Sequence, residues 1–334
     1  MFSRNAWLFY ILALSLTTFY LSRFPGHNGD MPFYIALVIE KEQGSMDGVV
    51  ERTKEVLRQE LPSKEYQDHA DRINSVDQMI FERYRIKPFY VLLVLTFHKL
   101  GFSYIHATLI PSLLCYFLIG LSIWQVVIKR LDPVKTFLVS MVCMLIFPTL
   151  LLARLSTPDS LSCFILLNAV FLIYFGRSKI LWYSLFMLAI CTRLDNVVSE
   201  LIFLFALWKW PVDRFANKLD TKKYILMSLG LIGIALLVNL TATHHFLWFM
   251  DPDFFGTPRT IFKKYRVILL CYSRVFFYVP VRNLYYFRAQ QGIQLEKGSE
   301  LYFFTQFVRL FSYGLFFTLF MKNDILHLIC YFPC

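Results

Sequence analysis

The sequence predicts an all-α polytopic membrane protein with about eight to ten transmembrane helices and a long first extracytoplasmic loop that carries interfacial amphipathic helices. The first observation is composition, because 57% of the 334 residues are hydrophobic and 17% are charged. Soluble domains are less apolar, and about 25% of their residues are charged. The second observation is that the apolar residues gather in runs near the roughly 20 residues that a membrane-crossing helix needs. The third is that basic residues cluster between these runs.

A single transmembrane domain, residues 1–334, accounts for the order of the runs. It comprises a first helix at 5–22, an extracytoplasmic loop at 23–105, a helical bundle at 106–243 and variable C-terminal helices at 244–334. No small-residue cleavage site follows the first helix, so it is interpreted as a retained signal anchor. The further runs expected to be helices are 106–128, 134–153, 160–176, 179–192, 196–209, 223–243, 266–281 and 301–321.

The first loop has its own helical pattern. Apolar residues between 46 and 61 recur at the spacing of an amphipathic helix, and Pro62 ends that pattern. Ser75 is expected to cap a second helix. The apolar segment "KPFYVLLVLTFHK", residues 87–99, contains Pro88, His98 and Lys99, and it is interpreted as a helix in the membrane interface. A membrane span is the alternative for this segment, and it would invert the orientation of everything downstream.

Clusters of Lys and Arg set the expected orientation. The segments "IKRLDPVK", "GRSK" and "KWPVDRFANKLDTKK" fall on one side if every run spans. The positive-inside rule makes that side the cytoplasm, with the N-terminus there too, in a multi-pass protein of the plasma (inner) membrane. The net charge of +11 is explained in this way and not by a nucleic-acid partner. It suits membrane lipids and an anionic lipid substrate as partners.

Four segments carry polar residues next to apolar helices. They are "GDMPFYIALVIEKEQG", "RIKPFYVLLVLTFHKLGFSYIHATLIPSLL", "ARLSTPDSLSCFILLNAVFLIY" and "LAICTRLDNVVSELIFL". They contain, in order, a first-loop Asp followed by a Tyr, a Pro before an apolar helix, an Arg before a Pro-Asp, and an Arg-x-Asp. Over about residues 1–210 this order resembles the GT-C superfamily of polyprenyl-phosphate-sugar-dependent membrane glycosyltransferases, which includes mannosyltransferases and aminoarabinose transferases.

The resemblance implies an enzyme of cell-envelope glycan biosynthesis, a hexosyl- or pentosyltransferase. It would move a sugar from a polyprenyl-phosphate carrier to a lipid, glycan or protein acceptor on the extracytoplasmic face. Such a transfer needs a carboxylate that takes the acceptor proton and cations that stabilise the leaving phosphate. Asp30 matches the catalytic base. The expected substrate-binding residues are Tyr34, Arg85, Lys87, Arg154, Asp159, Arg193 and Asp195.

Four of these residues also have a purely structural explanation. Asp30 is a good cap for a helix that starts at Met31, with a Pro in its first turn. Asp159 is placed to favour a helix dipole. Arg193 and Asp195 are candidate partners of each other, although residues two apart point in different directions on a continuous helix. The runs on either side of them form either one helix with half-buried charge or a broken pair.

Two other functions stay open at this point. One is a transporter or flippase for a lipid-linked or small substrate. The other is a non-catalytic relative of the glycosyltransferases, because Gly29 and Met31 stand beside Asp30 where the family often has a second acid. The sequence assigns no cofactor and no metal site. The alternative is a divalent cation on Asp30, Glu40 and Glu42.

Overall fold

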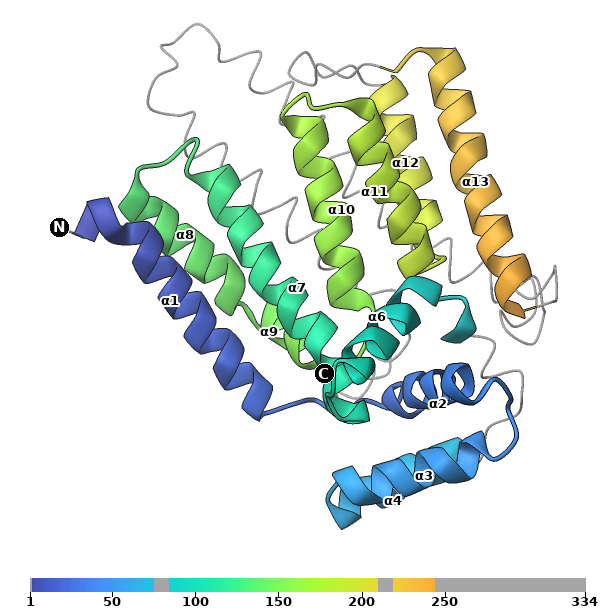
Figure 1. Ribbon diagram of the computed structural model, residues 1–334. Helices are drawn as coiled ribbons and strands as arrows, with labels where there is room; N and C mark the ends of the chain where they lie inside the picture. The colour runs from blue at the N-terminus through green and yellow to red at the C-terminus, as the bar shows by residue number, and fades with distance from the viewer. Residues whose placement is uncertain (1, 75–83, 210–218, 244–334) are drawn as a thin grey trace, which may run out of the picture. The chain divides into compact units, whose positions relative to one another are not determined.

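The computed structural model describes residues 2–74, 84–209 and 219–243 (Figure 1). In these ranges every regular element is a helix, and the β pairing found there is a lone parallel bridge between Gly26 and Leu155. The all-α prediction is therefore confirmed for the described residues. Helices suit an apolar chain because they satisfy each backbone polar group within the segment. The predicted helices at 266–281 and 301–321 lie outside the described residues, as does the rest of 244–334.

Three described helices are long and apolar enough to cross a bilayer, by length and composition. They are α1 (Phe2–Arg23), α7 (Tyr104–Val127) and α13 (Thr221–Thr243). Five more described helices are apolar but shorter. The three helices of full length are fewer than the eight to ten spans predicted for the whole chain. The shorter helices are α6 (Pro88–Lys99), α8 (Pro133–Leu145), α10 (Asp159–Tyr174), α11 (Lys179–Thr192) and α12 (Asn196–Lys209).

Helix α7 is the most buried of the three candidate spans, and α1 packs closely against it. The Tyr10 hydroxyl of α1 donates to the Gly120 carbonyl of α7 at 2.8 Å. A Cβ atom at Gly120 would lie 2.6 Å from the Leu14 side chain. A larger residue at this position would require the Leu14 and Tyr10 side chains of α1 to shift, so Gly120 suits the close approach of the two helices.

The run at 134–153 forms two helices, so its prediction as one helix is wrong. Helix α8 ends at Leu145, and α9 (Phe147–Arg154) begins after Ile146, whose φ of −64° and ψ of 142° are extended. Pro148 lies in the first turn of α9. Proline lacks the amide proton that a continuous helix would use at this point, and its ring disfavours helical geometry just before it.

The first loop contains more helix than the sequence indicated. The amphipathic helix is confirmed as α3 (Val49–Glu60), which buries Val49, Val56 and Leu57 and ends before Pro62. It packs against α2 (Met31–Gln43), which is buried from Met31 to Ile39. Helix α4 (Ser63–Asn74) was not predicted. The helix expected after Ser75 falls largely in 75–83, outside the described residues.

The apolar segment that follows this loop forms the short helix α6. Its 12 residues extend about 18 Å at 1.5 Å per residue, whereas the hydrocarbon core of a bilayer is about 30 Å thick. Helices α8, α11 and α12 are similarly short, so the interfacial position of this segment stays a prediction. Helix α6 contacts α2, α7 and α11, so it joins the first loop to the bundle.

Candidate functional site

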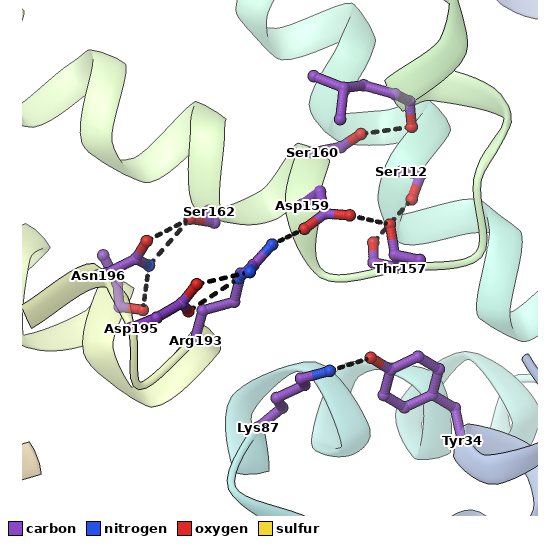
Figure 2. Close-up of polar contacts among 12 residues, drawn as sticks. Tyr34, Lys87, Ser112, Thr157, Asp159, Ser160, Ser162, Arg193, Asp195 and Asn196 are labelled. Atoms are coloured by element: carbon purple, nitrogen blue, oxygen red, sulfur yellow. Dashed lines mark hydrogen bonds and ion pairs between the residues drawn. The ribbon is translucent and has the colours of Figure 1, made fainter. Parts of the chain in front are cut away.

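Polar side chains from distant parts of the chain meet where α10 and α12 begin (Figure 2). The turn between α11 and α12 contributes Arg193 and Asp195, and the first residue of α10 contributes Asp159. Lys87 at the start of α6 and Tyr34 of α2 form a second group nearby (Figure 2). Six of the eight site residues predicted from the sequence belong to this region: these five and Asp30.

Arg193 is the centre of the first group. Its Nε and Nη2 atoms donate to the two carboxylate oxygens of Asp195 at 3.0 and 2.6 Å, and Nη1 donates to Asp159 (Figure 2). The side chains of Arg193 and Asp159 are 13% and 2% exposed, whereas that of Asp195 is 40% exposed. Asp159 is thus a buried ion-pair partner, beyond the helix-dipole role considered from the sequence.

The pairing of Arg193 with Asp195 depends on a break in the chain. Helix α11 ends at Thr192, and Arg193 is extended, with φ of −152° and ψ of 119°. The expectation that residues 193 and 195 point apart assumed a continuous helix. It is wrong because the turn between α11 and α12 lets both side chains approach each other. The broken-pair alternative for these two helices is the one that the structure contains.

Hydrogen bonds hold the carboxylate of Asp159 and the surrounding backbone in place. The Thr157 hydroxyl donates to Asp159 Oδ2 at 2.8 Å. Ser112 of α7 donates from its hydroxyl to the carbonyl of Leu155 at 2.6 Å and to that of Thr157 at 3.1 Å. On the other side, the Asn196 amide donates to the Ala189 carbonyl at 2.8 Å. The ion pair therefore rests on a fixed frame and not on free loops.

The mutual stabilisation of Arg193 and Asp195 outweighs their loss of water. Burial by itself raises the pKa of Asp195, but the Arg193 guanidinium more than offsets this effect and lowers the pKa below its usual value. Burial likewise acts to lower the pKa of Arg193, and the Asp195 carboxylate reverses the effect and raises it. Both groups are charged at neutral pH, since an opposite charge favours the ionised form.

The second group places a cation on a buried phenol. Lys87 donates from Nζ to the Tyr34 hydroxyl at 2.8 Å (Figure 2). The Tyr34 ring is fully buried between the rings of Tyr84 and Tyr90, with centroids 5.2 and 4.8 Å away. Burial first, and the Asp30 carboxylate second, raise the pKa of Tyr34 well above its usual value, so it remains a neutral hydroxyl.

Asp30 lies at the N-cap position of α2, as the sequence predicted, but its side chain makes no capping hydrogen bond. The capping explanation for its carboxylate is therefore wrong. The carboxylate accepts a hydrogen bond from the Tyr84 hydroxyl at 3.0 Å instead. Its charge also acts on Arg193, whose pKa it helps to raise. Asp30 is only half-buried, so this carboxylate remains within reach of solvent.

The two remaining predicted residues have partners of their own. Arg85 forms an ion pair with Glu40 at 2.6 Å, and Arg154 donates from Nε to the Phe24 carbonyl at 2.6 Å. Glu42 accepts a hydrogen bond from the Tyr104 hydroxyl. Within the described ranges, no three His, Cys, Asp or Glu residues gather as a metal site. This finding contradicts the divalent site suggested on Asp30, Glu40 and Glu42.

A small polar cavity lies beside Gly29, the residue that precedes Asp30 in the chain. Its volume is about 230 Å³. The lining residues are Pro25, His27, Gly29, Glu65, Asp68 and His69. The Nδ1 atom of His27 lies 2.5 Å from the Glu65 carboxylate of α4. Sequence reasoning missed this cavity because α4 itself was not predicted.

Several supporting residues were also missed. Tyr84 donates a hydrogen bond to Asp30, and Thr157 donates one to Asp159. Ser112 holds the loop before α10 through the Leu155 carbonyl. Each is a common polar residue. The partners of Tyr84 and Ser112 are far away in sequence, and Thr157 reaches Asp159 only because of the turn before α10. Glu200 gave a clearer signal, since a carboxylate within an apolar run is unusual. It is 1% exposed in α12.

Comparison with known proteins does not assign this arrangement to a family. No protein-family model, no curated protein and no solved structure matches the chain.

Proposed function

We propose that this protein is a GT-C-type glycosyltransferase that moves a sugar from a polyprenyl-phosphate carrier to an acceptor on the extracytoplasmic face of the membrane. The observation that supports it best is the convergence of one half-buried carboxylate, Asp30, with two cations, Lys87 and Arg193. They come from the first loop, the start of α6 and the α11–α12 turn. These three are among the eight site residues that the resemblance noted in the sequence implies.

The proposal includes a topology. Helices α8, α10, α11 and α12 cross the membrane together with α1, α7 and α13, whereas α6 lies in the interface. The helices predicted from the sequence at 266–281 and 301–321 bring the total into the range of about eight to ten. The N-terminus lies in the cytoplasm and the plasma (inner) membrane is the location, as the basic segments between helices favour. Asp30 and Arg193 are then on the outer side, where a polyprenyl carrier presents its sugar.

The reaction assigns one step to each group. The acceptor hydroxyl oxygen attacks the anomeric carbon of the sugar, and the bond from that carbon to the phosphate oxygen breaks. The phosphate keeps the bonding electrons and leaves as polyprenyl phosphate, while Asp30 takes the acceptor proton. The negative charge that builds on the phosphate needs positive partners that are already in position.

Lys87 and Arg193 are suited to that charge. The ion pairs of Arg193 use three of its N–H groups, and a guanidinium has five, so two can face a phosphate oxygen. The pair with Asp159 fixes its orientation. Lys87 is held on the Tyr34 hydroxyl and lowers the pKa of Asp195, so the two cations act on one region. The cavity beside Gly29 is then the natural place for the acceptor.

The deciding experiment measures polyprenyl-phosphate release from lipid-linked sugars by the purified protein in nanodiscs. Asp30→Asn is expected to lower the rate by about 100-fold or more, the usual range for loss of a general base. Asp47→Asn is the matched control, because Asp47 is an exposed acid of the same loop, and it should keep the wild-type rate. If folded Asp30→Asn turns over normally, Asp30 is not the base. A wild-type protein that releases nothing supports the non-catalytic alternative.

A transporter is the second candidate, and Glu200 is the observation that favours it. Its carboxylate is buried in α12, and among the described residues neither oxygen has a hydrogen-bond partner. Ionisable residues at such positions often carry protons through transporters. If the protein is a transporter, Glu200→Gln should abolish proton-coupled uptake into vesicles. If it is the enzyme, Glu200→Gln should leave sugar transfer largely unchanged. Asp30→Asn should have the opposite pattern if the enzyme proposal is correct.

A further inference from the structure

A larger cavity lies at the other end of the bundle. Its volume is about 560 Å³, within the range of about 300–1,000 Å³ that is usual for small-molecule sites. It lies among α1, the C-terminal half of α7 and the C-terminal half of α10. Trp124 in its wall is about 18 Å along α7 from Ser112, at 1.5 Å per residue. The cavity is therefore separate from the site around Arg193.

The walls of this cavity are mainly aromatic and aliphatic. Trp7 and Trp124 are in contact, with ring centroids 5.2 Å apart, and Phe171 and Leu172 lie on the α10 side. Ser122 adds a polar point and donates from its hydroxyl to the Leu118 carbonyl at 2.9 Å. A surface of this composition binds hydrocarbon better than it binds a sugar or a nucleotide.

Among the residues that the structure describes, the two charged side chains that line the cavity are both cations. Lys129 and Arg177 are exposed where α7 and α10 have ended. Lys129 Nζ lies 3.6 Å from the centroid of the Phe175 ring, so the ammonium group stays at the cavity. The nearest acid along the chain, Asp132, does not line it and pairs with Lys135 and two amides of α8. The cavity thus joins an apolar interior to a positive edge.

We infer that this cavity binds an anionic phospholipid, with an acyl chain against Trp7 and Trp124 and the phosphate between Lys129 and Arg177. An apolar interior with two cations at one edge is complementary to a hydrocarbon chain that ends in a phosphate. Basic clusters next to membrane-crossing helices attract anionic lipids for the same electrostatic reason. This inference does not depend on the proposed glycosyl transfer, since it concerns different residues at the opposite ends of α7 and α10.

The test is native mass spectrometry of the delipidated full-length protein titrated with phosphatidylglycerol and, separately, with phosphatidylcholine. Phosphatidylglycerol should bind at least about 10-fold more tightly, because each basic residue near a lipid surface contributes appreciably. The double variant Lys129→Gln/Arg177→Gln should lose that preference. Both side chains are exposed, so the variant should fold. Lys222→Gln/Lys223→Gln on α13 removes the same charge away from the cavity, and it should keep the preference.

Three outcomes would overturn the inference. Equal binding of the two lipids by the wild type would remove the role of the cations. An equal loss in the α13 variant would mean that net charge, and not the cavity, selects the lipid. Complete displacement of phosphatidylglycerol by millimolar glycerol phosphate or inorganic phosphate would assign the site to a soluble phosphate compound, since the acyl chain would then contribute nothing.

Discussion

The two ends of the α7–α10 pair are built in opposite ways. At one end Ser112 and Asp159 belong to a network in which a buried guanidinium binds two carboxylates. At the other end Lys129 and Arg177 stand exposed at the edge of an apolar cavity. Both ends are apolar helices next to charged loops in the sequence. The difference shows that a charged residue near a helix end joins a buried network only where the fold brings oppositely charged side chains to that end.

The physical reason is the number of partners within reach. Arg193 leaves α11 into a turn where Asp195 and Asp159 both lie close, so its burial is compensated. Lys129 follows the end of α7, where the carboxylate of Asp132 is already engaged by Lys135. It stays in water and lies on the Phe175 ring. The first end has a buried, compensated charge, and the second presents exposed cations.

Accessibility labelling gives the largest expected contrast between the ends. Single cysteines at Asp47 and Lys129, both exposed, are introduced into a protein whose seven native cysteines are replaced. A membrane-impermeant maleimide should label position 47 in intact cells and label position 129 only after permeabilisation. Labelling of 129 alone in intact cells would mean that the proposed orientation is inverted, and the site around Arg193 would then face the cytoplasm.

Removing the Arg193 guanidinium should cause the largest loss of stability. Arg193→Met leaves Asp159 buried without its cation, which costs about 3–5 kcal/mol in comparable buried pairs. Thermal unfolding in detergent measures the loss. Lys129→Met at the opposite end is the matched control and should stay near the wild type, because Lys129 is exposed. Similar stability of the two variants would contradict the buried network.

Two serines of α7 allow a finer comparison. Ser112→Ala should destabilise by about 1–2 kcal/mol, because two buried carbonyls lose their hydroxyl donor. Ser122→Ala should have a smaller effect, below about 1 kcal/mol, since that hydroxyl is partly exposed and bonds to the Leu118 carbonyl of its own helix and to Asn168 Oδ1 of α10. Chemical denaturation of both variants in the same detergent measures the two losses of unfolding free energy. A larger loss for Ser122→Ala would contradict the prediction.

The smallest effect is the pH dependence of the Asp195 contribution. Its folded-state pKa is lowered, so the stability it provides is present above the unfolded value of about 3.9 and is lost as pH falls through the folded value. The melting-temperature difference between wild type and Asp195→Asn should be constant from about pH 5 to 8 and shrink below about pH 4. A difference that changes steadily between pH 5 and 8 would indicate that another group is involved.

Helix ends marked by charge or proline were predictable to different degrees. The bounds of α11 and α12 match the apolar runs at 179–192 and 196–209, because "TRLDN" places charge at the junction. The break between α8 and α9 was missed although Pro148 marks it, since hydrophobicity continues across the break. Helix α4 packs a narrow face of Tyr66, Ala70 and Ile73 toward the core. Its prediction failed because this helical spacing stands among mostly polar residues.

The sequence by itself determined the helical class, the apolar runs, the amphipathic helix before Pro62 and the set of charged residues worth testing. Composition and spacing are local properties, and they fix these features. The tertiary structure decided which charges meet: Arg193 with Asp159, Tyr84 with Asp30 and Lys87 with Tyr34. It also decided that Arg85 and Arg154 bind elsewhere. Contacts between residues more than 30 positions apart depend on how whole helices pack. The spacing of residues along the chain does not determine how close such residues lie in space.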